Sequence, residues 1–95
     1  MKKLFPLTSE RHQPARVVEK VKSEVRKYLK RERGKKLGEE FDFWGFDCRT
    51  GKISSEVTIC HEKEIGKALD EALALEWPTL YIEIIAKPVK RTKRE

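Results

Sequence analysis

Two cysteines and two histidines are the side chains of this 95-residue chain best suited to metal binding, namely Cys48, Cys60, His12 and His61. A zinc site favours cysteines separated by about two to four residues, whereas eleven residues lie between these two. In the hairpin expected here, Cys48 lies near the tip and Cys60 near the base, which excludes a disulfide. We therefore expect no metal and no cofactor, and we expect Cys48 to be a small buried apolar residue.

The residues that could support catalysis are few. His61 stands at the start of an expected helix, where it could act as a general base or contact a phosphate, but a histidine there more often caps the helix. Asp42 and Asp47 fall on opposite faces of a strand, so they cannot form a pair of catalytic carboxylates. The chain has no glycine-rich phosphate loop and no nucleophile elbow. The sequence therefore predicts no enzymatic activity.

Positive charge is the strongest chemical signal, and it is unevenly distributed. The formal net charge is +6, but residues 11–36 hold eleven basic and three acidic residues, a balance of +8, while residues 37–86 hold four and eleven, a balance of −7. Like charges within a Debye length of about 8 Å repel one another, which favours binding of a polyanion. The alternative is a solvated surface, because basic side chains also favour the last turn of a helix.

The candidate nucleic-acid-binding residues form two groups. The main surface, at the end of the first expected helix and in the loop after it, consists of Arg26, Lys27, Lys30, Arg31, Arg33, Lys35 and Lys36, and a basic arm consists of Lys90, Arg91, Lys93 and Arg94. Such residues bind phosphates and release counterions without reading bases. The expected partner is nucleic acid, with structured RNA favoured over a specific DNA sequence.

The elements that must position these residues follow the order β-α-β-β-α-β. Strands are expected at residues 2–7, 41–48, 53–60 and 79–86, and helices at residues 14–33 and 62–76. Pro14 suits the first position of a helix and Gly34 a helix end, while Pro6 indicates an edge position or the end of a strand.

This order predicts an α+β protein with a two-layer, ferredoxin-like split β-α-β sandwich. Its four-stranded antiparallel sheet would have the order 4-1-3-2, with both helices on one face. Residues 1–86 would form a single domain, and residues 87–95 a flexible basic tail. In this routing the amino terminus, the end of the first helix and the tail meet at one end of the molecule. We therefore expect a single cationic pole there.

The central hairpin has a predicted register, with residues 49–52 as its turn. Cys48 would then oppose Ile53, and Trp44, Phe46 and Cys48 would point at the helices, with Cys60 on the opposite face. The uncovered face of the sheet would carry Phe41, Phe43, Tyr81 and Ile85. These aromatic residues could stack bases, although the glycine-aromatic signature of RNA-recognition sheets is missing. A surface for self-association or for another protein is the alternative function.

The sequence also indicates in which cellular compartment the protein is located. No apolar run approaches the roughly 20 residues of a membrane span, and the apolar stretch after Lys3 is too short for a secretory signal. Two cysteines are too few for a disulfide scaffold. We therefore expect a cytoplasmic protein that does not bind a membrane.

Several segments together resemble a family of short basic bacterial proteins that form a domain of unknown function. The resemblance is carried by residues 3–8, 26–33, 42–48, 84–88 and 91–93 and covers nearly the whole chain. It implies no activity. Relatives often have proline at the position of Gly38, an acidic residue at that of Gly45, and a glycine-histidine pair at Val89 and Lys90. If those side chains act chemically in relatives, this chain lacks them.

Overall fold

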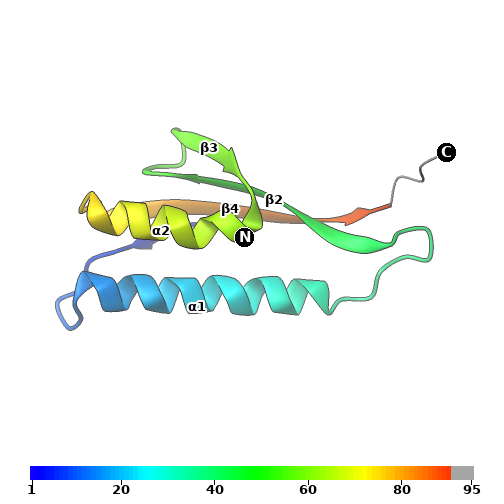
Figure 1. Cartoon of the computed structure of the whole chain (residues 1–95), viewed down its shortest axis with the longest axis horizontal. Coiled ribbons are helices and arrows are strands. Elements are labelled where there is room, and N and C mark those ends of the chain that lie inside the picture. The colour runs from blue at the N-terminus through cyan, green and yellow to red at the C-terminus, as the bar shows by residue number, and fades with distance from the viewer. Residues whose placement is uncertain (91–95) are drawn as a thin grey trace.

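The computed structural model describes residues 1–90, which form four strands and two α-helices (Figure 1). Along the chain these are β1 (Lys2–Pro6), α1 (Pro14–Arg33), β2 (Phe43–Gly51), β3 (Val57–Cys60), the short 3-10 helix η1 (Glu62–Glu64), α2 (Ile65–Ala74) and β4 (Thr79–Val89). The protein is therefore α+β, and the predicted order of elements is confirmed.

Both helices form where their apolar residues recur at helical spacing. Helix α1 begins at Pro14 and ends at Arg33, as predicted, and it buries Val18, Val21 and Val25 on one side. Helix α2 buries Ile65, Leu69 and Ala72. These side chains pack against Leu80, Ile82 and Ile84 of β4, each of which is 1% exposed or less. The core therefore lies between one face of the sheet and the helices, and the other face stays uncovered.

The sheet is open and antiparallel, but its strand order is β1-β4-β2-β3, so the predicted order 4-1-3-2 with its ferredoxin-like pairing is wrong. Strand β4 takes a central position because it is the longest strand and its inward side is entirely apolar. Strand β1 lies at the edge, one of the two placements that Pro6 indicated, whereas the predicted strand order placed it inside the sheet. The carbonyl oxygen of Met1 accepts a hydrogen bond from the amide of Ile84, and the amide of Leu7 donates one to the carbonyl of Pro78. The nitrogen of Pro6 therefore points away from the sheet, where its lack of an N–H group removes no hydrogen bond of the sheet.

Strand β4 continues to Val89, three residues beyond its predicted end, so Lys87 to Val89 belong to the sheet rather than to a tail. The extension exists because β2 offers a partner, with Phe43 opposite Val89 and Asp47 opposite Ile85. In Figure 1 this two-stranded ribbon reaches past β1 and β3 toward the end of the molecule where α1 finishes.

The β2–β3 hairpin has a different register from the predicted one. Cys48 opposes Cys60 and Gly51 opposes Val57, so the turn is formed by residues 52–56. Gly51 permits this register, because a Cβ atom at that position would collide with the carbonyl oxygen of Glu56 where the chain folds back. The shift turns Cys60 toward the helices. Trp44, Phe46 and Cys48 face the helix side as predicted, and Cys48 is buried.

Across residues 1–90, no helix combines the length and the apolar character needed to cross a membrane.

Candidate nucleic-acid interface

The largest group of basic side chains lies on the solvent-facing side of α1. Each member is exposed, and the group consists of Arg16, Lys20, Arg26, Lys27, Lys30 and Arg31. A helix rises about 1.5 Å per residue, so Arg16 and Arg31 are roughly 22 Å apart along its axis. We call these six residues the α1 cationic face.

The acidic residues of α1 do not neutralise this face. Glu19 pairs with Lys22 at 3.5 Å, Glu24 with Lys3 at 3.7 Å, and Glu32 with Lys35 at 2.6 Å. All three cations lie outside the α1 cationic face. Within residues 1–90, the six residues of that face make no ion pair, so their charge is available to a ligand.

A buried polar network supports the last turns of α1. Glu32 is only 8% exposed, and its hydrogen bond with Lys35 holds the pKa of its carboxyl group below the usual value. The hydroxyl of Tyr28 also bonds to Glu32, and burial raises the pKa of this phenol. The guanidinium of Arg31 lies 5.5 Å from the centre of the Tyr28 ring, which orients Arg31 on the outer face.

The structure separates the predicted main surface into free and paired residues. Arg26, Lys27, Lys30 and Arg31 belong to the α1 cationic face. Arg33, in contrast, donates to Glu62 at 2.5 Å and also lies over the ring of Phe46. Lys35 pairs with Glu32, which leaves Lys36 as the exposed cation of the following loop without an ion pair among the described residues.

The predicted basic arm is described only at Lys90, which is exposed, while Arg91, Lys93 and Arg94 lie outside the described residues. The end of the molecule near Lys90 is not purely cationic. The loop after α1 also carries Glu39 and Glu40, which are exposed, and Asp42, whose amide donates to the carbonyl of Val89.

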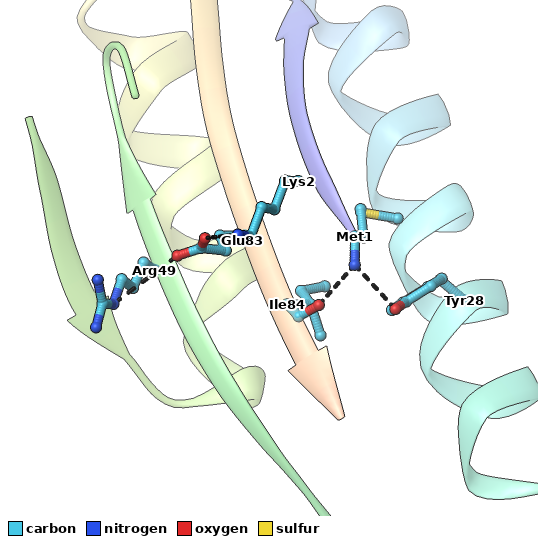
Figure 2. Close-up of polar contacts among 6 residues, drawn as sticks. All are labelled: Met1, Lys2, Tyr28, Arg49, Glu83 and Ile84. Carbon is cyan, nitrogen blue, oxygen red and sulfur yellow. Dashed lines mark hydrogen bonds and ion pairs between the residues drawn. The ribbon is translucent and has the colours of Figure 1, made fainter. Parts of the chain in front are cut away.

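The amino-terminal lysines do not strengthen that end either. Met1 is level with Ile84 of β4, five residues before the end of that strand, and its amine donates to Tyr28 at 3.0 Å and to Ile84 at 2.7 Å (Figure 2). Lys2 and Lys3 are engaged with Glu83 and Glu24. Among residues 1–90, the continuous cationic surface is therefore the outer side of α1, and the amino terminus does not join the end of that helix as expected.

Sequence reasoning missed Arg16 and Lys20 as members of this surface. Their signal was present, because positions 16, 20, 27 and 31 recur at four- and seven-residue spacing and share one side of a helix. The charge count by segment included both residues but did not assign them to a face.

The uncovered face of the sheet combines charge with apolar side chains. Glu83 of β4 lies between Lys2 at 3.6 Å and Arg49 at 3.8 Å, so three neighbouring strands are tied by one carboxylate (Figure 2). The same face carries four exposed apolar side chains: Leu4, Ile59 and Ile85 lie near these ion pairs, and Phe43 lies farther along β2, opposite Val89.

The aromatic residues considered for base stacking do not form one platform. Phe41 precedes β2 and packs over Gly38. Phe43 opposes Val89, whereas Tyr81 opposes Gly51, so eight residues of β4, or roughly 26 Å, separate the two rings along the strand. Continuous stacking of successive bases is therefore not supported.

The histidine and cysteine residues form no metal site in the described part of the chain, where no three ligand-type side chains cluster. Nδ1 of His61 accepts a hydrogen bond from the amide of Lys63, and Glu64 accepts one from the amide of His61. His61 thus caps η1, as its position indicated. Cys48 and Cys60 are free thiols that face each other across the hairpin.

These features define a small α+β domain whose open sheet is covered on one side by two helices, one of them strongly cationic on its outer surface. The chain belongs to a family of unknown function, DUF6172, whose model matches residues 1–95. No curated protein and no solved structure matches the chain.

Proposed function

We propose that this protein is a nucleic-acid-binding module without enzymatic activity, which holds structured RNA mainly through phosphate contacts. The observation that carries the proposal is the α1 cationic face, six exposed cations on a single helix with no ion pair among residues 1–90. Gathering these charges costs free energy in the isolated protein, and a polyphosphate backbone relieves that cost.

The side chains of α1 are suited to phosphate contacts, and apart from its arginines and lysines, which can also bind guanine, the helix offers few groups that read bases. Helix α1 has no asparagine or glutamine, the side chains that pair with adenine in the major groove of DNA. It also exposes no aromatic ring, because Tyr28 is half-buried beneath Arg31, so single-stranded bases have no stacking partner there. A folded RNA, whose helices present phosphates on their surface, suits such a surface best.

The test is a titration of the full chain with bulk cellular RNA at several salt concentrations. Each phosphate contact contributes about 0.7–0.9 to the slope of log affinity against log salt, so Lys20→Ala with Lys27→Ala should reduce the slope by roughly 1.5. The matched control is Lys63→Ala with Lys67→Ala, which removes the same charge from exposed positions in η1 and α2. Equal slopes for the two variants, or binding that does not depend on salt, would remove α1 from the interface.

A second candidate function, self-association or binding of another protein, is favoured by the uncovered sheet face. Four large apolar side chains are exposed there, with Ile59 at 77%. Isolated exposed apolar residues are common, but this group lies on one face that no helix covers. Under this candidate the chain forms a dimer through the sheet and shows no salt-dependent binding of RNA.

A further inference from the structure

Cys48 and Cys60 are the only two cysteines of the chain, and they occupy directly opposed positions in the β2–β3 hairpin. Opposed residues in an antiparallel pair project from the same face, here the side that packs against the helices. Their Cα atoms are typically about 4.5–5.5 Å apart, which lies within the range of about 4.4–6.8 Å found in disulfides.

We propose that Cys48 and Cys60 form a reversible modification site, at which a small disulfide such as oxidised glutathione converts the two thiols into an intramolecular disulfide between β2 and β3. This inference is independent of the RNA-binding proposal. It replaces the prediction that a disulfide is excluded, which depended on the wrong register.

The hairpin can accommodate the bond with a small movement. Cβ atoms of opposed residues are about 4.5–5.5 Å apart, whereas a disulfide needs about 3.5–4.5 Å, so the strands must approach by about 1 Å. Strand β3 has only four residues and pairs with β2 alone, because it lies at the edge of the sheet. Such an edge strand can move without disturbing the central strands.

The order of the two steps follows from access. Cys48 is 1% exposed, whereas Cys60 is partly exposed and lines an open cavity of about 460 Å³ between the hairpin and α2. The Cys60 thiolate attacks one sulfur of the small disulfide, forming a mixed disulfide and releasing one thiol. The Cys48 thiolate then attacks the Cys60 sulfur and releases the second thiol, so two protein thiols are oxidised and one small disulfide is reduced to two thiols.

The surroundings make this reaction slow at neutral pH and faster in alkali. Burial raises the pKa of the Cys48 thiol to about 11, and Cys60, Glu62 and Asp47 add negative charge near it. Burial also raises the pKa of Cys60, opposed by a hydrogen bond from Thr50 and assisted by Glu64. Because only the thiolate attacks, closure should accelerate by about tenfold per pH unit below these values.

The experiment treats the purified full chain with oxidised glutathione at pH 7 to 9 and follows intact mass and peptide maps without reductant. We expect a monomer that has lost two hydrogen atoms, a Cys48–Cys60 peptide link, and full reversal by a dithiol. Cys48→Ala should instead stop at the mixed disulfide on Cys60, because the resolving thiol is absent.

The matched control keeps two thiols but moves one. In Thr58→Cys with Cys60→Ser, the second thiol is diagonal to Cys48, about 7–8 Å away and beyond the reach of a disulfide, so no intramolecular link should form. Two outcomes in the wild-type chain would overturn the proposal. One is a stable glutathione adduct on Cys60 that never resolves, and the other is disulfide formation only between molecules.

Discussion

Glu32 shows how a single residue can serve the cationic surface without belonging to it. Its carboxylate is buried between Tyr28 and Lys35, and its ion pair with Lys35 links the last turn of α1 to the loop that follows. A buried carboxylate is tolerated only when it is paired and hydrogen-bonded, which is the case here. Lys35, which was predicted to bind phosphate, therefore forms a structural ion pair with Glu32.

The pH dependence of stability tests this role. The pKa of Glu32 is lower in the folded chain than in the unfolded chain, so its stabilising contribution is present above the usual carboxyl pKa of about 4.3 and is lost as pH falls through the folded value. Glu32→Gln should therefore lower Tm at pH 7, with the difference shrinking below about pH 4.

The control for this variant is Glu24→Gln, also on α1. Glu24 is exposed and lies 3.7 Å from an exposed Lys3, so its loss should leave Tm nearly unchanged at every pH. A pH-independent effect of Glu32→Gln, or an equal effect of both variants, would show that the charge of Glu32 is not what stabilises the turn.

At the scale of elements, the β2–β3 hairpin decides which side chains meet. A shift of its turn from residues 49–52 to residues 52–56 moves Cys60 to the helix side and places it opposite Cys48. The alternation of Val57 and Ile59 with Thr58 and Cys60 is compatible with either register. Close approach of the chain at Gly51 is what selects the observed one.

A pair of glycine substitutions tests this turn. Gly51→Ala should destabilise the protein by more than about 1 kcal/mol, because the new methyl group meets the backbone at Glu56 rather than a flexible side chain. Gly66→Ala in α2 is the control, since its Cβ would lie 4.0 Å from Lys22, and it should stabilise by up to about 1 kcal/mol. Chemical denaturation measures both, and a fully stable Gly51→Ala protein would contradict the turn.

At the scale of the whole molecule, the two candidate surfaces lie on separate layers. The α1 cationic face is on the outer side of the helical layer, whereas Ile59 and Ile85 are exposed on the sheet face that the helices leave uncovered. The sheet, the hydrophobic core and helix α1 lie between the two surfaces. Substitutions on one surface should therefore leave the activity of the other unchanged.

Sedimentation and RNA titration of the same variants test that independence. Ile59→Ser with Ile85→Ser should abolish any dimer and leave the salt dependence of RNA binding unaltered. Lys20→Ala with Lys27→Ala should reduce the salt dependence of RNA binding and leave any dimer intact. A lower salt slope in the serine variant would mean that RNA reaches the sheet, and the assignment of the interface to α1 alone would then be wrong.

Local patterns were sufficient for the elements and for the inward faces. The span of α1 and the inward side of β4 were predictable, because helical spacing and strand alternation act within a few residues, whereas the predicted strand order placed β1 inside the sheet. Membership in a family without known function was also recognisable from the sequence, since the likeness extends along nearly the whole chain.

Strand order, hairpin register and the pairing of charges were decided only by tertiary structure. Each depends on which distant segments come together in the folded chain. Strands β1 and β2 pair with the two opposite sides of β4, and Arg33 pairs with Glu62 instead of remaining in solvent. Residue types alone do not reveal which cations a carboxylate will reach. For that reason the expected routing placed the amino terminus in a cationic pole, whereas among residues 1–90 the continuous cationic surface is the outer side of α1.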